Sequence, residues 1–240
     1  MTVQTLQQDS KYWALVPAAG IGSRMNSNTP KQYLHLAGKT VIEHTLDRLA
    51  DVTQLSGIIV ALSEEDDYWE DVCLPEAMPV SVVAGGVERY LSVFNALQYL
   101  LIVADSQDWV LVHDAARPCV RSKDIQNLIE RVSTHEVGGL LGLPVRDTMK
   151  RTDANQQINT TVNRDSLWHA LTPQMFRLGD LMVALQYVID NDSPVTDDAS
   201  AMELSGQSPL MVEGHADNIK ITRPQDLQLA ELFIRQQLAE

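Results

Sequence analysis

A glycine turn followed by two cations is the part of this sequence that most directly suggests chemistry. Gly20 and Gly22 follow an apolar run that ends at Pro17, and Arg24 and Lys31 come next, seven positions apart. Glycines at a strand end let backbone N–H groups approach a phosphate or a base closely, and two cationic side chains beyond them can neutralise a polyanion. The segment therefore predicts a nucleoside triphosphate site.

Two common phosphate-binding motifs do not describe this segment. The dinucleotide fingerprint requires a third glycine where Met25 stands, and a P-loop requires a glycine at Tyr33, five residues before Gly38. An ordinary strand-to-loop turn, in which glycine supplies a positive φ, remains an alternative for the glycines alone. The cations favour a ligand site, because a plain turn does not need them.

Two later segments could also bind a nucleotide. Gly86, followed six residues later by Ser92, can present backbone amides and carbonyls to a base, although a helix start is an equally simple interpretation. Asp114, at the end of an apolar run, could ligate Mg²⁺, which prefers carboxylate and phosphate oxygens. A structural ion pair between Asp114 and Arg117 is the alternative, and we interpret the adjacent His113 as a packed neighbour rather than a base.

Composition limits the classes of partner. The chain has 240 residues, 45% of them hydrophobic, which is enough for a substantial core in a single α/β unit. Its net charge of −14 argues against non-specific binding to nucleic acid or a membrane surface. The two cysteines have no metal or redox spacing, residues 1–10 lack the apolar core of a signal peptide, and no run is long enough to span a membrane. We expect a soluble, cytoplasmic protein.

The elements that position these residues follow a βαβ pattern, because short β-branched runs alternate with longer helical patterns. In the resulting mostly parallel twisted sheet, with helices on both faces, a ligand binds at the carboxyl ends of the strands. The expected strands are 13–17, 57–62, 80–84, 109–113 and 139–145. The expected helices between them are 41–50, 64–72, 88–103 and 122–134.

The second half of the chain interrupts this pattern. Residues 146–162 are polar around a turn-rich centre and predict an inserted β-hairpin, which should project or pair with another chain; a surface loop is the alternative. The remaining expectations are helices at 178–189, near 197–204 and from 224 onward, with short strands at 210–213 and 219–222. We expect one domain over residues 1–240, with 146–162 as its arm.

The turn, the Pro30-Lys31-Gln32 segment, the His113 to Pro118 segment and the string from Arg164 to Gln174 resemble the 2-C-methyl-D-erythritol 4-phosphate cytidylyltransferases of the non-mevalonate isoprenoid pathway. The resemblance runs from about Trp13 onward and implies a Rossmann-like fold. Where the family commonly has an aspartate after the glycine pair, this chain has Val87, so a side-chain contact there is lost.

The resemblance also implies a role for each matching residue. Those implied to bind the nucleotide are Pro17, Ala18, Ala19, Gly20, Gly22, Gly86, Ser92, Asp114 and Ala115. Those implied to act in catalysis are Arg24, Lys31, Arg164 and Lys220. Those implied to bind the second substrate are Arg117, Thr148, Arg164, Thr196 and Lys220, with Asp114 and Asp217 as metal ligands. From the residues alone, Arg164 could be solvated, Thr196 could belong to a helix cap, and Asp217 with Lys220 could form a surface ion pair.

The reaction implied is the transfer of a cytidylyl group from CTP to 2-C-methyl-D-erythritol 4-phosphate, with Mg²⁺ as cofactor. A homodimer joined through the hairpin arm is implied by the resemblance alone. Two alternatives stay open: a cytidylyltransferase for another polyol phosphate such as ribitol 5-phosphate, and a non-catalytic nucleotide-sensing module on the same fold.

Overall fold

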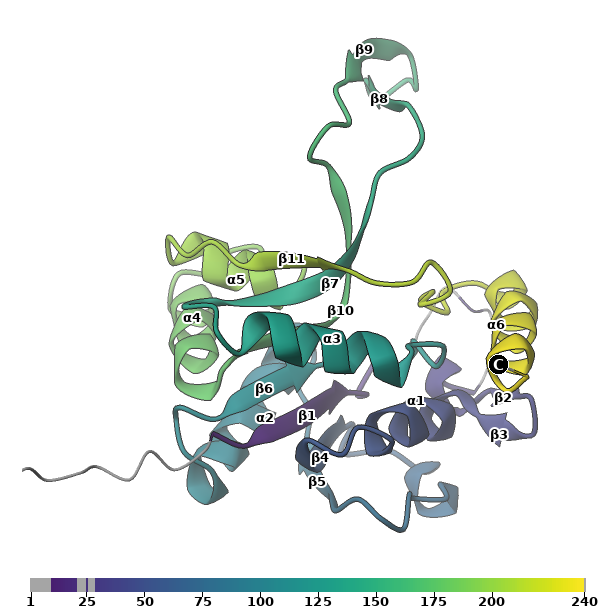
Figure 1. Cartoon of the computed structure of the whole chain (residues 1–240), viewed down its shortest axis with the longest axis vertical. Coiled ribbons are helices and arrows are strands. Elements are labelled where there is room, and N and C mark those ends of the chain that lie inside the picture. Colours follow the sequence, from purple (N-terminus) through teal and green to yellow (C-terminus); the bar gives the residue numbers. More distant parts are fainter. Residues whose placement is uncertain (1–9, 21–24, 26–28, 240) are drawn as a thin grey trace, which may run out of the picture.

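A seven-stranded sheet forms the centre of the computed structural model, which describes residues 10–20, 25 and 29–239 (Figure 1). The strand order is β11-β7-β10-β6-β1-β4-β5, and β10 alone among these strands runs antiparallel to its neighbours. The strands are β1 (Tyr12–Pro17), β4 (Leu55–Leu62), β5 (Val80–Ala84), β6 (Trp109–Val112), β7 (Gly138–Pro144), β10 (Trp168–Arg177) and β11 (Leu210–Glu213). The mostly parallel α/β architecture is confirmed.

Helices cover both faces of this sheet. Along β1, Ala14 and Val16 belong to a buried apolar cluster packed by α1 and α3, whereas Leu15 belongs to a second cluster packed by α2 and α4. Successive side chains of a strand point to opposite faces, so the apolar run of β1 contributes to both clusters. The helices are α1 (Val41–Ala50), α2 (Arg89–Val103), α3 (Ser122–Val132), α4 (Leu178–Asp190), α5 (Asp198–Leu204) and α6 (Pro224–Gln237).

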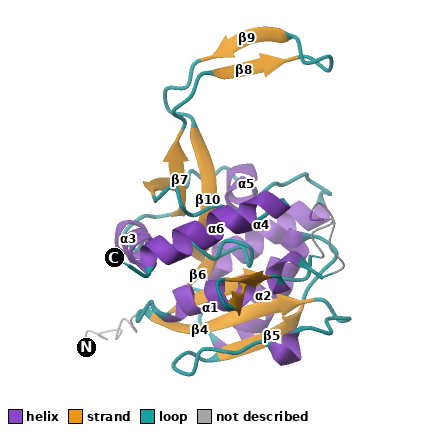
Figure 2. Ribbon diagram, turned by 90° about the vertical axis from the view of Figure 1, so that its right-hand side faces the viewer, coloured by secondary structure: helices purple, strands orange, loops and turns teal. Residues whose placement is uncertain are grey.

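The inserted arm is a β-hairpin, as the sequence predicts. β8 (Met149–Thr152) pairs with β9 (Ile158–Val162) antiparallel, in a sheet separate from the central one. Both figures of the whole chain show this hairpin standing well away from the body on the two strands that lead into it, β7 and β10 (Figures 1 and 2). A second small hairpin, β2 (His35–Leu36) with β3 (Lys39–Thr40), lies beside the start of α1.

Two sequence expectations are wrong, and some elements were not expected. The helix expected at 64–72 is replaced by a short 3₁₀ turn, η3 (Trp69–Asp71), because the Asp66 carboxylate accepts hydrogen bonds from the N–H groups of Tyr68 and Trp69 and so competes with a helix. Residues 219–222 form no strand, since the N–H of Ile221 donates to the loop carbonyl of Ala116. Strands β2, β3 and β10 and the short 3₁₀ turn η2 (Lys31–Tyr33) have no counterpart among the expected elements. The other expected helices and strands of the body start and end within two residues of their expected limits, and β8 and β9 lie within the expected hairpin, 146–162.

Within the described ranges, no helix combines the length and the apolar character that crossing a membrane would need.

Candidate active site

A pocket of about 600 Å³ lies where the carboxyl ends of β1 and β6 meet the start of α2. The residues that line it are Pro17, Ala18, Ala19, Gly20, Lys31, Gln32, Gly86, Val87, Glu88, Arg89, Ser92, Asp114, Ala115, Ala116 and Lys220. We call this the nucleotide pocket. It brings together the three segments that the sequence singled out, whereas Gly22 and Arg24 lie outside the described residues.

The glycine pair before α2 is required by close packing. A Cβ on Gly85 would lie 2.6 Å from the Cβ of Ala19, and a Cβ on Gly86 would lie 2.4 Å from the Cβ of Leu91. The buried hydroxyl of Ser92 accepts a hydrogen bond from the Gly86 N–H at 3.0 Å. Ser92 therefore holds the glycine loop in place, and Val87 at its tip is 97% exposed, as an apolar rim to the pocket.

The Pro30-Lys31-Gln32 segment forms the short 3₁₀ helix η2 (Lys31–Tyr33), which is fastened to the strand end beneath it. The buried amide of Gln32 donates to the carbonyl oxygen of Ala18 at 2.8 Å. The Lys31 ammonium donates to the carbonyl oxygen of Ile221 at 3.1 Å, next to Lys220. This arrangement places both lysines on the pocket wall. Gln32 has no role predicted from the sequence, although it belongs to the Pro30-Lys31-Gln32 motif.

Three cations surround the Asp114 carboxylate. The Nε atom of Arg89 lies 2.9 Å from Oδ1, while the Lys220 ammonium at 2.9 Å and the Nε atom of Arg117 at 3.3 Å face Oδ2. Burial alone would raise the pKa of Asp114, but Arg89, Lys220 and Arg117 together hold that pKa far below its usual range. Asp114 is therefore ionised at every physiological pH.

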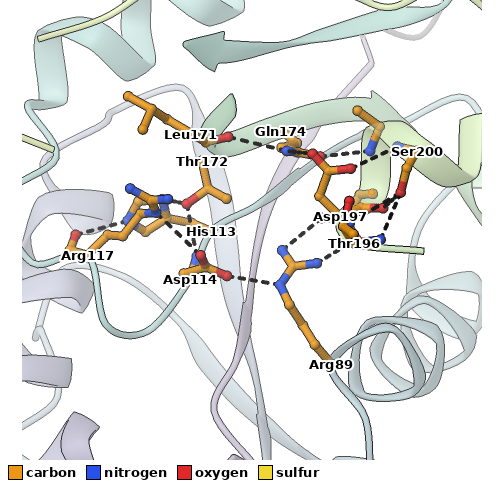
Figure 3. Close-up of polar contacts among 12 residues, drawn as sticks. Arg89, His113, Asp114, Arg117, Leu171, Thr172, Gln174, Thr196, Asp197 and Ser200 are labelled. Atoms are coloured by element: carbon orange, nitrogen blue, oxygen red, sulfur yellow. Dashed lines mark hydrogen bonds and ion pairs between the residues drawn. The ribbon is translucent and has the colours of Figure 1, made fainter. Parts of the chain in front are cut away.

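Arg89, to which the sequence assigned no role, also binds a second buried carboxylate, that of Asp198. Its two terminal nitrogens contact the two oxygens of Asp198 at 3.1 and 2.8 Å. Figure 3 shows Arg89 reaching from α2 toward Asp114 and toward the start of α5. The position of Arg89, three residues after Gly86 in a segment already singled out, could have identified it as a residue of the site.

His113 is a packed neighbour of the site, in agreement with its interpretation from the sequence. Its buried ring faces the Arg117 carbonyl through Nε2 at 3.1 Å and the Thr172 hydroxyl through Nδ1 at 2.9 Å. A carbonyl only accepts, so Nε2 carries the proton and Nδ1 accepts from Thr172, whose oxygen in turn accepts from the Asp114 N–H. Burial lowers the pKa of His113 to about 4, which keeps the ring neutral.

A second pocket, of about 530 Å³, adjoins the first and shares Arg89, Asp114 and Lys220 with it. We call this the acceptor pocket. Its remaining lining residues are Arg117, Ala170, Leu171, Thr172, Gln174, Thr196 and Asp197. The structure thus brings Arg117, Thr196 and Lys220 together, the three residues of the body that the resemblance assigns to the second substrate. Arg117 is largely buried and is held by Asp114 and by the carbonyl of Asn218.

The structure does not bring Thr148, Arg164 or Asp217 to either pocket among the described lining residues. Thr148 lies in the arm and Arg164 in the loop that directly follows it; both are exposed, and the Arg164 guanidinium donates to the carbonyl of Arg146 at the base of the arm. Asp217 is paired through Oδ2 with Arg121 at 2.7 Å and with Gln237 at 2.8 Å. Its other oxygen is buried and has no hydrogen-bond partner among the described residues. Asp217 therefore fastens the end of α6 to the loop that carries Lys220.

Comparison with known proteins gives a consistent assignment. The model of the 2-C-methyl-D-erythritol 4-phosphate cytidylyltransferase family matches residues 12–236. The enzyme of that name from Vibrio vulnificus strain CMCP6 is 51% identical over 221 residues, which cover 92% of this chain and 93% of the relative. The one from Hahella chejuensis is 50% identical over 233 residues, 97% of each chain.

Solved structures agree with the sequence relatives. The crystal structure of the Francisella tularensis 2-C-methyl-D-erythritol 4-phosphate cytidylyltransferase superposes with a TM-score of 0.80 at 37% identity, over 93% of this chain and all of that one. A 4-diphosphocytidyl-2C-methyl-D-erythritol synthase superposes with a TM-score of 0.82, also at 37% identity, over 95% of this chain. These matches extend across both pockets and the arm, and the chain therefore belongs to the 2-C-methyl-D-erythritol 4-phosphate cytidylyltransferase family.

Proposed function

We propose that the protein joins CTP to 2-C-methyl-D-erythritol 4-phosphate in isoprenoid precursor biosynthesis. A phosphate oxygen of the acceptor forms a bond to the α-phosphorus of CTP, the bond from that phosphorus to the bridging oxygen breaks, and pyrophosphate leaves with the bonding electrons. The observation that carries this proposal is the pair of adjoining pockets that share Arg89, Asp114 and Lys220, in a chain that matches the family along almost its whole length.

In this proposal the nucleotide pocket binds CTP and the acceptor pocket binds 2-C-methyl-D-erythritol 4-phosphate. The glycine loop at Gly86 and the strand end at Ala18 line the nucleotide pocket, where their backbone groups can meet the base and the triphosphate. Two polyanions repel each other, and negative charge accumulates on the α-phosphate during attack, so positioning and charge neutralisation are the protein's main tasks. Lys31 faces the nucleotide pocket, whereas Lys220 faces both pockets and can meet the acceptor phosphate.

We propose Mg²⁺ as the cofactor, with Asp114 as its protein ligand. The residues fit a site completed by phosphates, because Mg²⁺ is commonly bound through one or two carboxylates and substrate oxygens. Asp114 is ionised and lines the pocket, and the described part of the chain contains no cluster of three acidic, histidine or cysteine side chains that would hold the ion alone. When bound, the ion would be held by Asp114 together with substrate phosphates and would offset the negative charge of those phosphates. Asp217 is not among the described residues that line either pocket, and its contacts are with Arg121 and Gln237, which together favour a structural role for that residue.

We further propose that the protein is a cytoplasmic homodimer in which each arm completes the partner's acceptor pocket. Thr148 lies in the arm, which stands away from the body, and Arg164 directly follows it; neither is among the described residues that line the two pockets, which supports a role at a neighbouring subunit. The planar fork of an arginine is suited to clamp a phosphate there. A reducing compartment agrees with the two free cysteines, Cys73 and Cys119.

An acceptor and nucleotide screen tests this proposal. The purified protein is incubated with Mg²⁺, each of the four common nucleoside triphosphates, and either 2-C-methyl-D-erythritol 4-phosphate or ribitol 5-phosphate, and pyrophosphate is followed. We expect release with CTP and methylerythritol phosphate alone. Preference for ribitol 5-phosphate would move the assignment to the other polyol, and binding of CTP without release in any mixture would favour a sensing module.

A further inference from the structure

Arg89 occupies an unusual place, because it belongs to both substrate pockets and to a third cavity beside Tyr90 and Val195. It is the first residue of α2, and each nitrogen of its guanidinium has a carboxylate partner. The Nε atom contacts Asp114 at 2.9 Å, and the two terminal nitrogens contact Asp198 at 3.1 and 2.8 Å. A single planar group therefore joins three separate segments of the chain.

Asp198 has no direct access to substrate. Its side chain is 0% exposed, and it is absent from the described lining of all three cavities. Burial raises the pKa of Asp198, and the ion pair with Arg89 opposes that shift. A buried carboxylate is costly unless it is paired, and removing its partner leaves the cost in full. The pair therefore acts as an anchor behind the pocket wall.

The anchor fixes one wall of the acceptor pocket. Asp198 begins α5, directly after Thr196 and Asp197, which line that pocket. The Asp197 carboxylate caps the helix through the Ser200 N–H at 2.9 Å and accepts from the Gln174 amide at 2.9 Å. Figure 3 shows this group of polar contacts on one side of Arg89 and Asp114 on the other.

We infer that Arg89 is a positioning residue that holds Asp114 and the Thr196–Asp197 wall at a fixed separation, so that the two phosphates meet in a reactive geometry. The inference rests on the proposed function, because it assigns the two pockets to two substrates. It requires the planar fork of arginine, since a lysine carries the same charge but cannot contact both carboxylates in this manner. Misplacing reacting groups by about 1 Å can cost roughly 10²-fold in rate.

Three variants test this inference by steady-state kinetics. Arg89→Lys retains the charge, Asp198→Asn removes the anchor without touching a pocket, and Arg235→Lys is the matched control in an exposed pair with Glu231. We expect Arg89→Lys and Asp198→Asn each to lower kcat by roughly 10- to 100-fold, with both KM values changing less than kcat, and Arg235→Lys to keep wild-type kinetics. A kcat within about twofold of wild type in either of the first two variants would overturn the inference.

A rescue experiment separates positioning from a general loss of structure. Ethylguanidinium added to Arg89→Ala is expected to raise kcat by about tenfold or more, whereas ethylammonium, which has the same charge, is expected to raise it far less. Equal rescue by both cations would show that charge alone matters and would overturn the inference.

A thermal-unfolding cycle keeps this test independent of the proposed reaction. Arg89→Ala and Asp198→Asn are measured singly and together, and the double variant should unfold no lower than the less stable single variant, because both changes break the same link. Additive losses would overturn the link. If the wild-type protein releases no pyrophosphate from CTP with any acceptor, the proposed function is wrong. The thermal-unfolding cycle would still show whether Arg89 and Asp198 are linked.

Discussion

Replacing Lys220 with methionine removes one ammonium from the junction of the two pockets and keeps the length of the side chain. Lys220 lies 2.9 Å from Asp114 and lines both pockets, so it is the cation best placed to face the acceptor phosphate while CTP occupies the other side. Arg89 and Arg117 continue to contact Asp114 in the Lys220→Met variant. The variant should therefore fold, and its defect should lie in the chemical step.

The size of that defect follows from the charge that is lost. Two unit charges about 4 Å apart interact by about 4 kcal/mol at an effective dielectric constant of about 20. The side chain of Lys220 is 36% exposed, so solvent screening reduces this value, and we take about 3 kcal/mol as the loss of transition-state stabilisation. Since about 1.4 kcal/mol corresponds to a tenfold change in rate, kcat should fall by roughly 10²-fold.

The assay is pyrophosphate release at saturating CTP and acceptor, accompanied by a melting curve. Lys39→Met is the matched control, because Lys39 forms an ion pair with Asp47 at 2.6 Å on the surface, away from the site. The control should keep wild-type turnover. A Lys220→Met enzyme whose kcat stays within about threefold of wild type would refute the reasoning, because the lost charge would then have no part in the transition state.

Three further predictions concern other parts of the site. Lys31→Ala should lower kcat by roughly 10²-fold or more with an unchanged circular dichroism spectrum, because Lys31 lines the nucleotide pocket; near-normal turnover would remove its assigned role. Arg164→Ala should raise the KM for the acceptor and leave the KM for CTP almost unchanged, and an equal loss of both would mean that the arm acts through assembly. Because the native pKa of His113 is lowered from 6.5 to about 4, the unfolded state binds a proton between these pH values that the native state does not. The stabilisation that comes from a neutral His113 is complete above pH 6.5 and is lost as the pH falls toward 4. The unfolding free energy should decrease by about 3 kcal/mol over this range. Measured by urea unfolding from pH 6.5 to 4, the unfolding free energy should fall less steeply with pH in His113→Asn than in the wild type. Identical pH dependence in the two proteins would contradict a neutral, buried His113.

Local pattern was sufficient to predict the elements that form the frame of the site. The apolar run of β1 serves both faces of the sheet, and the capping box of Thr40 and Glu43 starts α1 at the residue where the pattern places it. Strand β10 could not be predicted in the same way, because it contains Pro173 and the polar Gln174. The amide of Gln174 is satisfied by distant partners, including Asp197. Its pairing with β6 and β7 is a tertiary effect that overrides local propensity.

The residues of the site likewise fall into those that local sequence predicts and those that only the fold brings together. Spacing within one segment identified Lys31, Ser92 and Asp114, all of which line the nucleotide pocket. The link between Arg89 and Asp198 spans 109 positions, and each residue alone resembles an ordinary charged residue in a first helical turn. For Asp217, the resemblance implies a metal ligand and the residues alone allow an ion pair with Lys220, whereas the structure pairs its carboxylate with Arg121 and Gln237, which are far from it in sequence.

A crystal structure of the protein with CTP and Mg²⁺ tests the central claim most directly, since that claim concerns where the triphosphate lies. The account predicts the cytosine against the glycine loop at Gly86, the phosphates between Lys31 and Asp114, and the Lys220 ammonium facing the acceptor side. Bound CTP with the Lys31 and Lys220 side chains both directed away from its phosphates would contradict it.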